Sequence, residues 1–101
     1  MFEEVRKVFK GYKGTIEETE KSITIKAKND IFGHKIDCDC SVSLLENSEN
    51  PYGVDVCEKT YRYLGGRGCP CRDMDEVISV LKECLKVFNF EEERQLSLFD
   101  L

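Results

Sequence analysis

Six cysteines and one histidine carry most of the metal-binding and redox chemistry available to this chain. Four of the cysteines form two Cys-x-Cys pairs, Cys38-Asp39-Cys40 and Cys69-Pro70-Cys71, and Cys57, Cys84 and His34 are possible further ligands. Zinc sites in proteins use four such ligands in a tetrahedron, typically with spacers of about two to four residues within each pair. The one-residue spacer in both pairs is therefore tighter than a zinc site usually has.

Three of the cysteines have apolar neighbours that favour a place in the core. Cys38 and Cys40 alternate with polar residues between Ile36 and Leu44, so they share the apolar face of a predicted strand. Cys84 lies in the apolar stripe of a predicted helix. Because a free cysteine behaves as a small hydrophobic residue, we expect these three thiols to pack inside the domain.

The remaining cysteines, Cys57, Cys69 and Cys71, are the candidate site of an alternative function, a zinc-binding or redox module. A fourth ligand would come from Cys38, Cys40 or His34. Cys69 and Cys71 lie in a glycine-rich segment just before a predicted helix, whose dipole would lower the pKa of the Cys71 thiol and make it reactive. Outside this alternative the sequence implies no cofactor, and we expect His34 to lie in a turn at the surface.

Other catalytic patterns are missing from the sequence. Gly65-Gly66-Arg67-Gly68 precedes a predicted helix but lacks the Lys-Ser/Thr ending of a phosphate-binding loop, so it predicts a turn between a strand and a helix. Asp37 and Asp39 share one strand face, but no histidine accompanies them as a partner in acid-base chemistry. We therefore expect a protein that is not an enzyme.

The last residues of the chain carry its most specific motif. Gln95-Leu96-Ser97-Leu98-Phe99 resembles the pentapeptide with which bacterial polymerases, repair proteins and some phage proteins bind the β sliding clamp of the replicase. The family pattern is Gln-Leu-(Ser or Asp)-Leu-Phe, and this chain matches it at every position. The resemblance implies that Leu98 and Phe99 fill the main pocket and that Gln95 sets the register. Leu96 would make a shallower contact, and Ser97 would be a tolerant spacer.

This resemblance implies an adaptor that docks on the clamp in replication or repair, encoded by a bacterium, a phage or a mobile element. The body of the domain would then recruit a second protein or block competing clamp partners. Two alternatives remain open: the cysteine-based module, and a protein-interaction domain of unknown partner in which the last helix simply continues. In that last case Leu98 falls off the helical stripe, and glutamates 91–93 lie where the helix dipole disfavours negative charge.

Composition limits the other function classes. The chain has 101 residues, 41% hydrophobic and 35% charged, which is enough for one small domain. Its net charge of -5 weighs against direct binding to nucleic acid. No apolar stretch is long enough for a membrane span, and the first ten residues lack the apolar core of a signal peptide. We therefore expect reduced thiols and a cytoplasmic location.

The periodicity of the chain predicts a single α+β domain over residues 1–90 and a flexible tail over 91–101. Amphipathic helices are expected at 1–10 and from about 74 to 89, the second with Asp73 as N-cap and Glu76 completing a capping box. Strands are expected at 22–28, 36–44 and about 54–64, and the pattern of 12–18 is ambiguous. Three or four antiparallel strands would form a sheet with both helices on one face and a polar set of Asp, Ser, Thr and Lys on the other.

Overall fold

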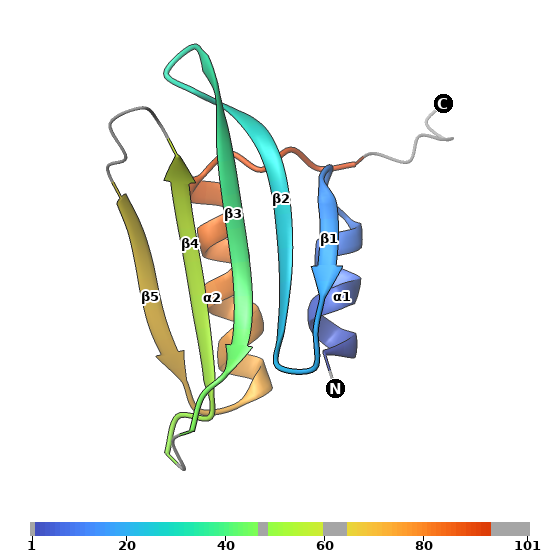
Figure 1. Cartoon of the computed structure of the whole chain (residues 1–101), viewed down its shortest axis with the longest axis vertical. Coiled ribbons are helices and arrows are strands. Elements are labelled where there is room, and N and C mark those ends of the chain that lie inside the picture. The colour runs from blue at the N-terminus through green and yellow to red at the C-terminus, as the bar shows by residue number, and fades with distance from the viewer. Residues whose placement is uncertain (1, 47–48, 60–64, 94–101) are drawn as a thin grey trace.

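Two layers, one of strands and one of helices, make up the computed structural model, which describes residues 2–46, 49–59 and 65–93 (Figure 1). The elements in chain order are α1 (Glu3–Lys10), β1 (Thr15–Glu18), β2 (Ser22–Ile31), β3 (His34–Leu44), β4 (Tyr52–Lys59), β5 (Gly65–Cys71) and α2 (Met74–Val87). The strands form one antiparallel sheet in the order β1-β2-β3-β4-β5. Both helices pack on the same face of the sheet, α1 against β2 and α2 against β3, β4 and β5. The predicted α+β class is therefore confirmed.

The sheet has one strand more than the three or four that the sequence predicted. The glycine-rich segment expected to be a turn is β5, whose backbone pairs with β4 from Cys71 opposite Tyr52 to Gly65 opposite Glu58. Glycine and proline weaken the interior of a sheet, but β5 is an edge strand, where only one side needs partners and proline is tolerated. The strand expected at about 54–64 is β4, and residues 60–64 lie outside the described residues.

Local signals explain the bounds of α2. The side chain of Asp73 accepts a hydrogen bond from the Glu76 N–H at 2.9 Å, and a Glu76 carboxylate oxygen accepts one from the Arg72 N–H at 2.9 Å. The first bond satisfies one of the amide groups that the first turn of a helix leaves without partners. The second differs from the predicted capping box, because Glu76 bonds the N–H of Arg72, the residue before the N-cap, in place of the Asp73 N–H. The helix ends at Val87, and Asn89 follows in the left-handed region with a φ of 58°.

The core fills the space between the helices and the covered face of the sheet. Its fully buried members come from both helices and the three central strands, together with Phe2 before α1 and Cys71 at the end of β5. They include Phe9, Ile25, Val56 and Leu81. Burying an apolar side chain of this size contributes about 1.5–3 kcal/mol. The three cysteines expected in the core, Cys38, Cys40 and Cys84, are all buried there.

The opposite face of the sheet is polar, as the alternation of the strands predicted. Lys28 and Asp37 lie opposite each other on β2 and β3 and form an ion pair at 3.1 Å. On the same face, the hydroxyl groups of Thr24 and Ser41 are hydrogen-bonded at 2.7 Å. Cross-strand pairs of this kind fix the register of β2 against β3.

Candidate functional site

The predicted clamp-binding peptide, residues 95–99, lies outside the described residues, so the structural question is how the chain leads to it. The possibility that the last helix runs on into the peptide is wrong, because α2 ends at Val87. Phe90 then turns back into the core, where only 6% of its surface is exposed. The apolar stripe of α2 therefore ends at the turn formed by Asn89, and Phe90 is the next side chain buried in the core.

Residues 91–93, which the sequence grouped with the tail, are paired with the segment between α1 and β1. The Lys13 N–H donates to the Glu91 carbonyl at 2.8 Å, and the Glu93 N–H donates to the Gly11 carbonyl at 2.8 Å. The side chains of Lys13 and Glu91 add an ion pair at 3.6 Å. The chain is therefore held against the domain as far as Glu93, beside the outer strand β1 of the sheet (Figure 1).

A second set of contacts ties the end of α2 to the β2–β3 hairpin. The side-chain amide of Asn29 donates to the Phe88 carbonyl at 3.0 Å. In the opposite direction, the Asn89 side chain donates to the Asp30 carbonyl at 2.7 Å. Asn29 is 4% exposed, and this bond satisfies an amide that would otherwise be costly to bury. The base of the hairpin and the segment leading to the peptide therefore form one connected unit.

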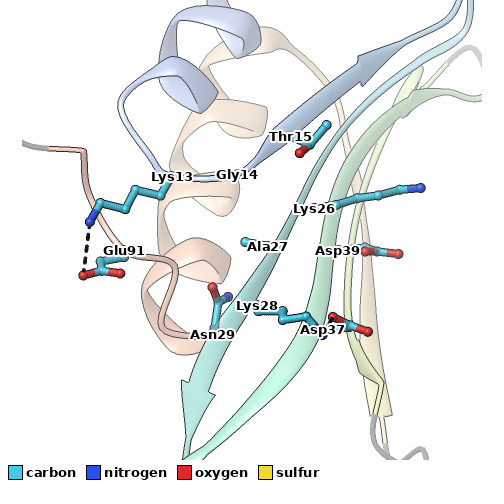
Figure 2. A pocket seen from close by; sticks show the side chains of 10 residues that line it. All are labelled: Lys13, Gly14, Thr15, Lys26, Ala27, Lys28, Asn29, Asp37, Asp39 and Glu91. Carbon is cyan, nitrogen blue, oxygen red and sulfur yellow. Dashed lines mark ion pairs between the residues drawn. The ribbon is translucent and has the colours of Figure 1, made fainter.

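An open hollow of about 600 Å³ lies beside this unit (Figure 2). It forms because β1 begins at Thr15, opposite Lys26, whereas β2 continues to Ile31 without a β1 partner. The lining residues come from the start of β1, from β2 and β3, and from the segment after α2. They are Lys13, Gly14, Thr15, Lys26, Ala27, Lys28, Asn29, Asp37, Asp39 and Glu91.

The charges that line the hollow balance one another. It has three lysines and three carboxylates, and each lysine is in an ion pair. The pairs are Lys13 with Glu91 at 3.6 Å, Lys26 with Glu17 at 3.2 Å, and Lys28 with Asp37 at 3.1 Å. Balanced, solvent-exposed pairs create little local field, so the hollow has no electrostatic preference for an ionic ligand.

Cys71 is less reactive than its place before α2 suggested. Its side chain is buried, and its thiol donates to the Cys69 carbonyl at 3.6 Å. Burial, reinforced by the neighbouring Cys69, Glu76 and Asp73 side chains, raises the pKa of Cys71 to about 11. The expected helix-dipole activation is therefore wrong, because burial and acidic neighbours outweigh a dipole that acts only near the helix terminus.

The high pKa of Cys71 predicts a loss of stability in alkali. Because the folded-state pKa lies above the ordinary thiol value of about 9, the folded state favours the neutral thiol. This contribution to the free energy of unfolding is fully present below pH 9 and is lost as the pH rises through 11. We expect the Tm to fall between pH 7.5 and pH 10.5, and to fall less in a Cys71→Ala variant, as thermal melts at both pH values will measure. An equal fall in both proteins would contradict this prediction.

The three cysteines of the alternative module differ in their surroundings. Cys69 is exposed and Cys71 is buried, and the side chain of Cys57 lies outside the described part of the chain. His34 begins β3, ten positions from Leu44, and Leu44 shares a register row with Tyr52 and Cys71.

At about 3.3 Å per residue, His34 is about 33 Å along the strand from that row, too far to join Cys71 at one metal. His34 itself is exposed, as expected. Among residues 2–46, 49–59 and 65–93, no three His, Cys, Asp or Glu side chains form a group that could hold a metal ion.

Comparisons with protein families, with curated proteins and with solved structures find no match to this chain. Within the described residues, neither helix is long and apolar enough to cross a membrane.

Proposed function

We propose that this protein is a small non-enzymatic adaptor of a bacterium, phage or mobile element that binds the β sliding clamp through Gln95-Leu96-Ser97-Leu98-Phe99. The observation that carries the proposal is the match of all five residues to the clamp-binding pattern. Such a peptide gains its affinity by placing apolar side chains in preformed pockets of the partner.

The described part of the chain supports this proposal in two ways. Within the described residues, the core consists of side chains from residues 2–90, and the helix that would have carried Leu96 and Phe99 into it ends at Val87. Glu93, the last residue that the structure describes, is hydrogen-bonded to Gly11 and lies two positions before Gln95. An extended peptide that starts so close to the domain brings the body of the adaptor directly against the clamp.

The body would act by what it brings to the clamp or keeps away from it. With a net charge of -5, it is suited to contact proteins and not the phosphate backbone of DNA. We propose that it recruits a second protein to the clamp or obstructs competing clamp partners, in the cytoplasm and in a step of replication or repair. The zinc alternative has no geometric support in the described residues. The buried thiol of Cys71, with its pKa raised to about 11, does not favour the redox alternative.

The direct test is a calorimetric titration of the full chain, and of a shortened chain that ends at Glu93, against a bacterial β sliding clamp. We expect the full chain to bind with a Kd on the order of micromolar, because ordering the tail offsets much of the contact energy. The shortened chain should not bind, although its Tm should equal that of the full chain because every described contact is retained. The proposal fails if the full chain does not bind, or if both chains bind equally.

A further inference from the structure

The two outer edges of the sheet differ in how they are protected. β1 is only four residues long, and its Glu18 is tied to Arg6 of α1 by an ion pair at 2.8 Å. β5 is seven residues long, and no described segment lies beside its outer side (Figure 1). Natural proteins usually keep edge strands short, charged or covered, because the free backbone groups of an edge pair readily with another strand. β5 is therefore the edge to which a further strand can be added.

The backbone groups at the free edge of β5 follow from the alternation of hydrogen bonds across the sheet. In an antiparallel sheet, successive residues of a strand bond to opposite neighbours. The bond from the Leu45 N–H to the Pro51 carbonyl, 2.7 Å long, continues the rows of β3 and β4, so odd-numbered residues of β4 bond to β3 and even-numbered ones to β5. These even-numbered residues lie opposite odd-numbered residues of β5. Gly66, Gly68 and Pro70 therefore turn their backbone groups away from the sheet.

This edge is complementary to a second copy of itself. When two β5 strands run antiparallel with Gly66 of one copy opposite Gly68 of the other, each outward N–H donates to an outward carbonyl, on both sides of a two-fold axis. Pro70 has no N–H, and its ring would block a partner strand. In this register, however, it lies beyond Gly65, the first residue of β5 in the second copy. The glycines have no side chains that would keep the two edges apart.

The helices leave room for this pairing. α2 packs against β3, β4 and β5, and β4 is the middle strand of the three (Figure 1). In two paired copies the β4 strands would be three strand spacings apart, or about 14 Å, because neighbouring strands are about 4.8 Å apart. Packed helices are about 8–10 Å apart, so the two α2 helices would face each other without collision.

A cavity of about 350 Å³ between α2 and the free edge of β5 adds a match of charge. Its lining includes Cys69 of β5 and the exposed Glu83 of α2, which forms no ion pair within the described residues. Arg67 shares a strand face with Cys69, because the two residues are two positions apart. In the paired register the two copies of Arg67 lie opposite each other at the two-fold axis, and the two Glu83 carboxylates offset their repulsion.

We propose that this protein forms a two-fold dimer in which the β5 strands pair edge to edge, with Gly66 opposite Gly68 of the second copy, and join the two sheets into one. The inference does not rest on the proposed function, since it uses no residue beyond α2. The joined surface is small, so we expect a transient dimer with a Kd on the order of 10 µM. Sedimentation from about 1 µM to about 1 mM should show the mass rise from that of one chain to that of two.

Gly68→Pro tests the backbone pairing, because it removes an outward N–H and places a ring at the edge. We expect dimerisation to weaken at least about tenfold. Since Pro70 already lies at an outward position of the same strand, the Tm should change little. Gly68→Ala is the matched control, because it keeps the N–H. Its Cβ would lie 2.8 Å from a carboxylate oxygen of Asp55, the end of a flexible side chain that turns aside, so G68A should dimerise like the natural chain.

Arg67→Cys tests the register. Directly opposed residues of a pair without mutual hydrogen bonds have Cα atoms about 4.5 Å apart, within the range of a disulfide. Diamide, which is reduced as two thiols become a disulfide, should therefore link two copies of R67C through position 67. Arg72→Cys, just beyond β5, is the matched control and should not link. Nor should the natural chain, because its Cys69 lies opposite Gly65 of the second copy.

Three results would each overturn the dimer: a natural chain with the mass of one chain at every concentration, a G68P variant that dimerises like the natural chain, or an R67C variant that links no more than R72C. A chain that ends at Glu93 should dimerise like the full chain. If it does not, the tail and not β5 holds the copies together. None of these results bears on clamp binding, which the calorimetric titration measures separately.

Discussion

Replacing Leu98 and Phe99 together by alanine is expected to weaken binding to the β sliding clamp by about 30-fold to about 1000-fold, which corresponds to about 2–4 kcal/mol. The physical reason is that apolar anchors in fully desolvated pockets carry most of the affinity of a short docking peptide. The Tm should not change, because the described core is built from residues 2–90. Calorimetric titration and a thermal melt of the same preparation measure the two effects.

Leu101→Ala is the matched control for this double variant, since it removes an apolar side chain of the same tail from outside the motif. Its affinity for the clamp should equal that of the natural chain. A Tm several degrees lower for the double variant would mean that Leu98 and Phe99 belong to the core. A loss of affinity in Leu101→Ala as large as that of the double variant would mean that general hydrophobicity, and not the motif, drives binding.

The parts of the fold that sequence predicted well are those with a strict local period. The strand around Cys38 and Cys40 alternates buried and half-buried residues from Cys38 to Ser43, and both cysteines are buried. The stripe of α2 repeats at helical spacing, and Asp73 caps its first turn through the Glu76 N–H. In each case the signal lies within a few neighbouring residues, so no knowledge of the rest of the chain is needed.

The parts that sequence missed depend on contacts between distant residues. β5 has the composition of a loop, and it is a strand because β4 lies alongside it from Tyr52 to Glu58. The segment after α2 is held by backbone bonds to Gly11 and Lys13, which no local pattern records. Backbone N–H and C=O groups are the same in almost every residue type, so strand pairing of this kind cannot be predicted from amino-acid composition.

The same division applies to the candidate sites. The place of Cys71 before α2 was visible in the sequence and suggested an activated thiol, but its burial, which reverses the expected pKa shift, comes from packing. The geometry of the turn between β2 and β3 was also hidden, because Phe32-Gly33 is not a typical turn pair and only the backbone reveals the positive φ of Phe32. A search for bulky residues directly before glycine between two alternating strands would have found it.

Alanine at Gly14 is expected to lower the free energy of unfolding by about 3 kcal/mol, because the new side chain meets two obstacles at once. A Cβ there would lie 2.8 Å from the Lys26 carbonyl oxygen and 2.9 Å from a side-chain carbon of Ile25, and the φ of 150° already disfavours it. The backbone of β2 cannot yield without breaking its pairing with β1, which begins at the next residue. Urea denaturation of the natural and variant chains measures the difference.

Gly33→Ala separates the two causes, since Gly33 also has a positive φ, of 83°, but no atom lies within 4 Å of an added Cβ. Only backbone strain remains there, and we expect a loss of about 1 kcal/mol. The excess at Gly14 is then the energy of the close approach of the chain to β2, at the corner where Lys13 holds the segment leading to the peptide. Equal losses of unfolding free energy at the two glycines would contradict this prediction. They would mean that the backbone around Gly14 moves away from β2 at little cost, and that the segment after α2 is held less firmly than its hydrogen bonds imply.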